Sequence, residues 1–309
     1  MSLDIVALGH IIHETIVFPD FTTKSVLGSP PAYSMVCAAR LGAKVGLVTK
    51  IGSDYPKRLL CPFYEAKVDT EGIRCSGDVS TTTQLVYARD GSKVIHYLKK
   101  APKIAFEDVP QSYHDARLFY VCPMDFEAPF ETVQQLRGLG GLLAADVGGF
   151  GGAHVVPQPA PQMEKDPEGT QRLFRTFDII KASDEDCRRL TGDVHVDVHS
   201  LGRQFLSWGV KIVVITKGSR GALVITRDSE RLIPAFPGKP IDVTGGGDTY
   251  MAGFLFRYLQ TNDVFQAGLF GAVTALLVIE GTGGVSAARM PTFDMVEARL
   301  QKGRRQLGI

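Results

Sequence analysis

Short apolar runs recur along the chain, each followed by a segment with helical periodicity, and this alternation constrains the fold most strongly. The run at 212–215, Ile-Val-Val-Ile, is apolar on both faces, which is typical of a strand covered by helices on both sides of a parallel sheet. The runs lie at 5–8, 45–48, 118–121, 142–145, 179–180 and 212–215. We therefore predict an α/β fold with a doubly wound, mainly parallel sheet flanked by helices, in a single domain over residues 1–309.

Two regions interrupt this alternation with short strand-like runs that have no helix between them. They fall within residues 12–24 and 79–100, and the second contains the turn sequence Arg-Asp-Gly-Ser at 89–92. Such strands cannot bury both of their faces alone. We predict that they form a small antiparallel sheet that folds over one edge of the core. This sheet acts either as a lid or as the surface through which two copies form a homodimer. A surface hairpin without a role is the alternative.

Proline and glycine are dense at 148–169, so a long loop is predicted there.

The balance of charge limits the partners of the protein. The sequence has 34 Lys and Arg residues and 33 Asp and Glu residues, so neither nucleic acid nor an acidic membrane is an expected partner. The apolar run at 269–279 is shorter than the roughly 20 residues of a membrane-spanning helix. No secretory signal is recognised, and the five cysteines are scattered, so a cytoplasmic location is expected.

A glycine-rich turn opens a predicted helix in the C-terminal third of the chain. Gly245, Gly246 and Gly247 precede Asp248. Consecutive glycines bring backbone N–H groups close to a ligand, and a helix start adds unpaired donors and a positive dipole end. The turn therefore predicts an anion cradle. The Asp248 carboxylate is expected to stay ionised and to accept a proton from a hydroxyl that attacks a phosphorus atom. An ordinary tight turn with Asp248 as a helix cap is the alternative.

The wider string, D-V-T-G-G-G-D at 242–248 followed by Ala-Gly at 252–253, resembles the signature of the ribokinase (PfkB-type) carbohydrate kinase family, D-T-x-G-A-G-D. The resemblance extends from residue 5 to about 291. It implies a ribokinase-like fold and transfer of the γ-phosphoryl group of ATP, with Mg²⁺, to a hydroxyl of a small polyhydroxylated molecule. It also implies that Asp248 and the three glycines are catalytic. A potassium ion held by carbonyls near Asp242 is a secondary hypothesis.

An N-terminal string, Gly-Ser-Pro-Pro-Ala-Tyr at 28–33, is similar to the family motif G-G-x-x-A-N. The resemblance implies that Gly28, Ser29 and Tyr33 bind the substrate. Because Ser29 replaces a glycine and Tyr33 an asparagine, an acceptor other than the usual furanose is implied. Glu14 and Glu127 match acidic positions that accept hydrogen bonds from sugar hydroxyls, although either alone could be a solvated surface acid.

The nucleotide side is implied by three shorter strings. Ser-Asp-Glu-Asp at 183–186 is similar to the family's N-x-x-E, which implies that Asp186 holds Mg²⁺ through water. Thr-Lys-Gly-Ser-Arg-Gly at 216–221 and Gly-Thr-Gly-Gly at 281–284 look like turns that contact the nucleotide. The residues implied for nucleotide binding are Ser183, Thr216, Gly218, Gly221, Thr244 and Gly283.

The acceptor remains open among a sugar, a cyclitol and a nucleoside. Ser183 and the altered sugar motif are similar to inositol kinases of the family, which favours a cyclitol slightly. A non-catalytic sugar- or nucleotide-binding sensor with the same fold is the rival function. A nicotinamide-dependent oxidoreductase would need the dinucleotide pattern G-x-G-x-x-G, which the strand-end glycines do not supply.

Overall fold

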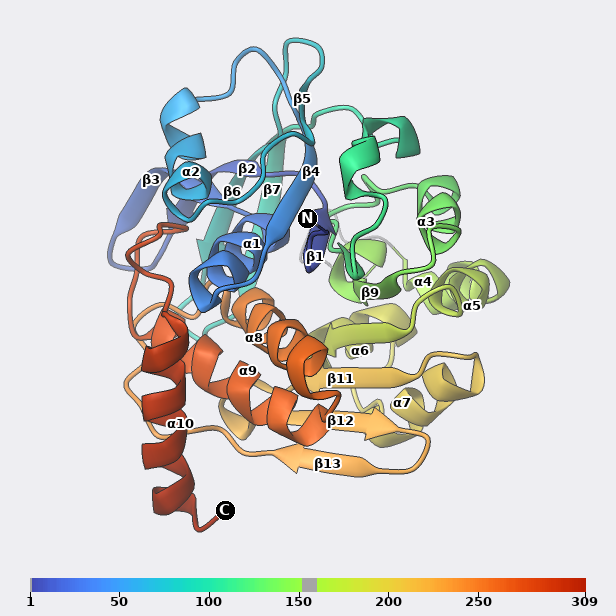
Figure 1. The fold of residues 1–309 in the computed structure, drawn as a ribbon, viewed down its shortest axis with the longest axis vertical. Coiled ribbons are helices and arrows are strands. Elements are labelled where there is room, and N and C mark those ends of the chain that lie inside the picture. Colours follow the sequence, from blue (N-terminus) through green and yellow to red (C-terminus); the bar gives the residue numbers. More distant parts are fainter. Residues whose placement is uncertain (1, 152–159) are drawn as a thin grey trace.

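A computed structural model describes residues 2–151 and 160–309. Its main sheet has nine strands in the order β13-β12-β11-β10-β9-β8-β1-β4-β5 (Figure 1). The six predicted strands are confirmed and form its parallel centre. They are β1 (Ile5–Leu8), β4 (Val45–Ile51), β8 (Leu118–Val121), β9 (Leu142–Asp146), β10 (Ile179–Ser183) and β11 (Ile212–Thr216). At the edges, β5 (Ile73–Cys75) is parallel, whereas β12 (Ala222–Thr226) and β13 (Glu230–Ile233) are antiparallel.

The second sheet contains the two regions predicted to interrupt the α/β alternation. Its order is β3-β2-β6-β7, and its strands are β2 (Ile12–Val17), β3 (Thr22–Gly28), β6 (Thr82–Tyr87) and β7 (Lys93–Lys99). The outer pairs are antiparallel, as expected, but β2 and β6 at the centre are parallel. This sheet has a small hydrophobic cluster of its own, with Ile16, Leu85 and Ile95 buried. We call it the lid sheet.

Helices cover both faces of the main sheet. Along β1, Ile5 and Ala7 belong to one buried cluster and Val6 and Leu8 to the other, because successive side chains of a strand point to opposite faces. Figure 1 shows α1, α8 and α9 together on one face. The helices are α1 (Pro30–Leu41), α2 (Cys61–Glu65), α3 (Phe130–Arg137), α4 (Gln162–Lys165), α5 (Pro167–Phe174), α6 (Asp184–Thr191), α7 (Val198–Ser207), α8 (Gly246–Thr261), α9 (Val264–Ile279) and α10 (Phe293–Leu307).

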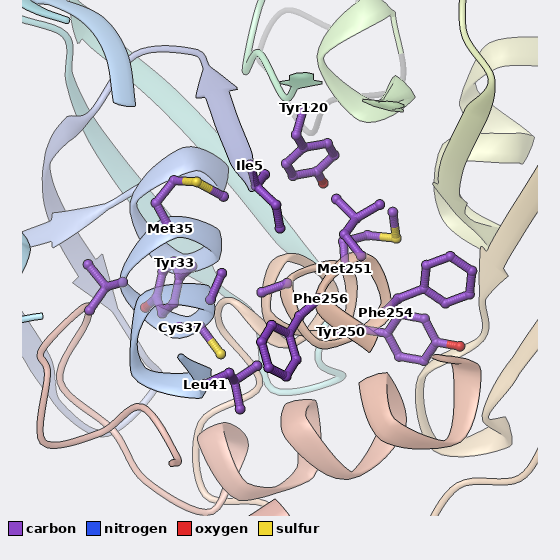
Figure 2. Packing of buried hydrophobic residues seen from close by; sticks show 14 of the residues in the cluster. Ile5, Tyr33, Met35, Cys37, Leu41, Tyr120, Tyr250, Met251, Phe254 and Phe256 are labelled. Carbon is purple, nitrogen blue, oxygen red and sulfur yellow. The ribbon is translucent and has the colours of Figure 1, made fainter. Parts of the chain in front are cut away.

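The packing of α1 against α8 positions the N-terminal ends of both helices, which line the cavity described below. Figure 2 shows Cys37 of α1 close to Phe256 of α8, with Met35 and Ile5 toward one side of the same cluster and Met251 toward the other. All five side chains are buried. Since α1 and α8 share this core, their N-terminal ends are held at the same edge of the main sheet. None of the helices within the described ranges is long and apolar enough to span a membrane.

The predicted loop at 148–169 is partly helical. Its described part contains α4 and the first residues of α5, so the prediction is wrong there. Pro167 occupies the first turn of α5, where a missing N–H group breaks no helical hydrogen bond. Residues 152–159 of the predicted loop lie outside the described residues.

Candidate active site

A cavity of about 330 Å³ lies between the carboxyl ends of the central strands and the lid sheet. The carboxyl ends of parallel strands are the usual place for a ligand in an open α/β sheet. Three groups of residues line it. The lid sheet supplies Glu14, Leu85, Lys93 and Ile95; the start of α1 supplies Ser29, Pro30 and Tyr33; the strand ends and the start of α8 supply Asp146, Lys181, Ser183, Asp186, Thr216, Gly218, Thr244 and residues 245–248.

The glycine turn forms the floor of this cavity at the start of α8. Gly245 has φ +78°, and a Cβ there would lie 2.3 Å from the Tyr33 ring, so only glycine fits both the backbone and the contact. The Gly246 N–H donates to the Val243 carbonyl at 3.1 Å. The next amides, of Gly247 and Asp248, lie in the first turn of the helix, where no carbonyl within the helix can accept them. The N-cap residue of this helix is Gly245, which makes no side-chain cap bond, so the alternative of Asp248 as a helix cap is not supported.

A buried lysine lies beside the cradle. Lys181 pairs with Asp146 in register across β10 and β9, and its Nζ lies 2.7 Å from Asp146 Oδ2. A Cβ on Gly247 would be 3.1 Å from the same Nζ. Although burial alone lowers the pKa of Lys181, the carboxylates of Asp146, Asp186 and Asp248 raise it above its usual range. The cradle is therefore accompanied by a permanent positive charge.

Asp248 is less acidic than expected from a position at the lip of the cavity. Burial, followed by repulsion from Asp146 and Asp186, raises its pKa to about 6, against the attraction of Lys181 and Lys93. The carboxylate is thus mostly ionised near neutral pH but is a stronger base than an exposed aspartate. Such a pKa suits a group that accepts a proton near pH 7.

Two carboxylates near the carboxyl ends of β9 and β10 fit a magnesium ion. Asp186 closes a capping box at the start of α6: its Oδ2 accepts the Ser183 N–H at 2.8 Å, and the Ser183 hydroxyl accepts the Asp186 N–H at 3.0 Å. The Oδ1 atoms of Asp186 and Asp146 lie 3.2 and 3.3 Å from the position of a Cβ on Gly148. Mg²⁺ is commonly held by one or two carboxylates together with water and phosphate oxygens.

The opposite end of the cavity combines a buried acid with an unpartnered hydroxyl. Glu14 is 4% exposed, and its Oε1 accepts a hydrogen bond from Thr83 at 3.1 Å. Burial raises its pKa to about 7. The buried Ser29 hydroxyl has no hydrogen-bond partner among the residues that the structure describes. Ser29 holds φ +104° and ψ 153°, a region essentially restricted to glycine. Strain and an unsatisfied polar group together are features of a ligand site.

Five predicted site residues do not line the cavity. Glu127 has a structural role, because its carboxylate accepts N–H groups of His10, Met124 and Asp125 at 2.7–3.1 Å; it is not placed to bind a sugar. Gly28 makes room for Glu14, whose Oε2 would lie 2.3 Å from an added Cβ. The other three are Gly221, Gly283 and Asp242.

Gly221 and Gly283 have backbone roles instead. Gly221 has φ +84° in the turn between β11 and β12, and an added Cβ would lie 2.0 Å from the Ile233 carbonyl. Gly283 has φ +103°. Asp242 lies beneath the glycine turn, where its Oδ1 accepts the Thr244 N–H at 2.9 Å and its Oδ2 accepts the Thr282 hydroxyl at 3.1 Å.

Sequence reasoning missed Asp146, Lys181 and Lys93 as residues of the cavity. Asp146 and Lys181 had a usable signal, since a charge within a strand that is buried on both faces needs a partner. Lys93 gave no such signal, because alternating polar residues are ordinary in a small sheet.

An amide cradle at a helix start, with a carboxylate beside it and two further acids that could hold a magnesium ion, is the arrangement used by a class of phosphotransferases. The chain matches the model of the pfkB family carbohydrate kinases over residues 10–291, and it belongs to that family. It is a phosphotransferase that acts on a hydroxyl group. The nicotinamide-dependent alternative is thereby excluded.

Named relatives and solved structures agree with this assignment. The chain is 30% identical over 285 residues to a cytidine kinase of Thermococcus kodakarensis, covering 91% of this chain and 98% of the relative. An Escherichia coli protein assigned as ribokinase II, solved with ATP and Mg²⁺, has a TM-score of 0.79 at 16% identity and covers 98% of this chain and 100% of its own. A fructokinase double mutant of Vibrio cholerae, solved with fructose, ADP and a potassium ion, has a TM-score of 0.77 at 21% identity, with coverage of 97% and 99%. At these identities the two structures show the fold.

Proposed function

We propose that this protein transfers the γ-phosphoryl group of ATP to a hydroxyl of a small sugar, cyclitol or nucleoside, with Asp248 as the base. The observation that carries the proposal is that Asp248 lies at the start of α8, in one cavity with the glycine cradle and with Glu14. A new bond forms between the acceptor oxygen and the γ-phosphorus, and the bond from that phosphorus to the β,γ-bridging oxygen breaks. The hydroxyl proton passes to the Asp248 carboxylate, and ADP leaves.

The cradle amides and Lys181 act on the transferring group. Backbone N–H groups and a fixed cation stabilise charge that develops on equatorial phosphoryl oxygens, and they need no reorganisation during the reaction. Ser183, Thr216 and Gly218 line the same cavity, and in this proposal they contact the nucleotide. When bound, Mg²⁺ would neutralise phosphate charge, and Asp186 with Asp146 would hold it.

The lid sheet covers the acceptor end. Leu85 and Ile95 present apolar surface to the cavity, beside Lys93, and exclusion of water there limits wasteful hydrolysis of ATP. In this proposal residues 1–309 act as one domain in the cytoplasm, and the outer face of the lid sheet is the surface for a homodimer.

The acceptor is proposed as a nucleoside or a polyol of similar size. A relative named cytidine kinase supports a nucleoside, whereas Tyr33 and Ser183 favoured a cyclitol. ADP release is measured with ATP and Mg²⁺ in the presence of cytidine, adenosine, ribose, fructose or myo-inositol. Release that depends on at least one hydroxyl compound is expected, with phosphate on the acceptor. ATP binding by calorimetry without turnover on any acceptor would favour the sensor function instead.

Replacement of Glu14 by glutamine should make the protein more stable and a poorer enzyme. The folded pKa of about 7 lies well above the usual range of a glutamate, so ionisation of Glu14 destabilises the folded state progressively as the pH rises from that range through about 7. The amide avoids this cost, which reaches about 3 kcal/mol at most. The Tm of Glu14→Gln should match that of the wild type near about pH 5 and exceed it near about pH 8.

The same variant tests the role of Glu14 toward the acceptor. Loss of hydrogen bonds from acceptor hydroxyls to a carboxylate should raise the acceptor KM by about 10- to 100-fold. Glu127→Gln, in a carboxylate that binds backbone amides, is the control: it should lower Tm with little change in KM. An equal difference in Tm between Glu14→Gln and the wild type at both pH values would contradict the assigned burial.

A further inference from the structure

Carbonyl oxygens converge beneath the glycine turn, where the sequence suggested a potassium ion. A site for such an ion needs several carbonyl or carboxylate oxygens around one point. The carbonyls of Asp242, Thr244 and Gly284 and the Asp242 carboxylate meet this requirement. In the structure, however, these oxygens surround the guanidinium of Arg289. Its Nη2 donates to the carbonyls of Asp242 at 3.1 Å and Thr244 at 3.3 Å, and its Nη1 donates to that of Gly284 at 3.0 Å.

The guanidinium uses its whole donor capacity here. Arginine has five N–H donors in a fixed planar arrangement. Beyond the three bonds above, Nη1 donates to the Tyr33 hydroxyl at 3.2 Å and Nε to the Val278 carbonyl at 3.1 Å. The Arg289 side chain is only 4% exposed. A potassium ion does not fit unless the guanidinium leaves.

Charge balance requires a cation at this point. The Asp242 side chain is fully buried, and its carboxylate lies 3.5 Å from Arg289 Nη2. A buried carboxylate is very unfavourable without a positive partner. Arg289 provides the same single charge as K⁺, but it is covalently tethered to the chain.

We infer that Arg289 substitutes for the monovalent cation, so that this protein folds and works independently of K⁺. Arg289 is then a positioning residue. In a trans peptide unit the C=O and the next N–H point in opposite directions, so the bond from Arg289 to the Thr244 carbonyl directs the Gly245 N–H away from Arg289. The guanidinium thereby fixes the orientation of the first peptide unit of the cradle.

The wild-type protein gives the first test. Tm without any substrate and turnover with the accepted substrate are compared in KCl and in tetramethylammonium chloride at equal ionic strength. Both should be unchanged, within about 1 °C and about twofold. Stabilisation by K⁺ of several degrees, or activation of about tenfold or more, would overturn the inference. The Tm comparison is independent of the proposed function, whereas the turnover comparison rests on it.

Removal of the guanidinium gives the second test. Arg289→Ala leaves Asp242 buried without its partner, so Tm in tetramethylammonium should fall by about 5–10 °C. The opened cavity should then respond to small cations: KCl or a few millimolar guanidinium chloride should recover part of the Tm, and part of the turnover, of this variant alone. Arg299→Ala is the control, because Arg299 binds the Pro237 carbonyl and Glu280 instead; its Tm should not respond to the cation.

A purely structural role would give a different pattern. If Arg289→Ala loses stability but neither K⁺ nor guanidinium restores it, Arg289 is an ordinary buried ion-pair partner and the inference fails. If Arg289→Ala does not fold, Arg289→Lys retains one charge with fewer donors. It should fold with a lowered Tm that KCl leaves unchanged, because the ammonium occupies the site; a K⁺-dependent rise in its Tm would contradict the substitution.

Discussion

Replacement of Asp248 by asparagine should lower kcat by about 10²- to 10⁴-fold, the range expected for a positioned general base. The amide has nearly the same shape, so the start of α8 and the cradle amides should be preserved. ATP affinity, measured by calorimetry, should change little. Tm should be equal or higher, because the buried charge is removed. A kcat within a few-fold of the wild type would defeat the role of Asp248 as base.

The pH dependence follows from the pKa of the same group. The base must be ionised, and its pKa is raised to about 6, so kcat/KM should rise with pH below this value and level off above it. Glu14, with a pKa of about 7, titrates nearby. The profile is therefore also measured in Glu14→Gln, where the limb near about pH 6 should persist. Asp263→Asn, at the N-cap of α9, is a matched control that should leave the profile unchanged, since Asn and Asp cap equally well.

Local patterns were sufficient to predict the six central strands of the main sheet and the glycine turn that lines the cavity. Strands buried on both faces have continuous apolar runs, so β1, β8 and β11 were recognisable one at a time. Glycines before a helix indicate an anion cradle wherever they occur. The parallel pairing of β2 with β6 was not predictable from hairpin signals, because it joins strands distant in the chain.

Contacts between distant segments explain the remaining differences between the predictions from the sequence and the structure. Arg289 lies 47 positions from Asp242, and no local pattern connects the two. Glu127 shows the opposite difficulty: a carboxylate that binds the amides of its own turn looks the same in the sequence as one that faces a ligand. The pairing of Lys181 with Asp146 depends on the register of neighbouring strands, which follows only once the sheet order is known.

Replacement of Lys181 by methionine should reduce kcat by about 10²- to 10³-fold, because a fixed cation beside the transferring phosphoryl group is lost. The raised pKa of Lys181 means that the wild-type residue is charged throughout any practical assay range, so its contribution should not vary with pH. The variant should also be less stable by about 3–5 kcal/mol, since Asp146 remains buried without its partner. The effect of Lys181→Met on kcat therefore has to be separated from its effect on stability.

The double variant Asp146→Asn, Lys181→Met achieves this separation. It removes both charges of the buried pair, and its free energy of unfolding should return close to that of the wild type, because replacing a whole buried pair by neutral groups is often nearly neutral. Its kcat should stay as low as that of Lys181→Met. Lys211→Met is the control, because the Lys211 side chain is exposed, the buried Asp178 keeps Arg137 as a partner when Lys211 is lost, and the pair lies outside the cavity. If the double variant recovered kcat along with stability, Lys181 would serve only to neutralise Asp146. Recovery of stability alone would show that the loss of kcat in Lys181→Met does not come from lost stability. Because Asp146 is also proposed to hold Mg²⁺, the single variant Asp146→Asn is measured at saturating Mg²⁺ beside it, and a kcat well above that of the double variant would place the charge of Lys181 on the reacting phosphoryl group.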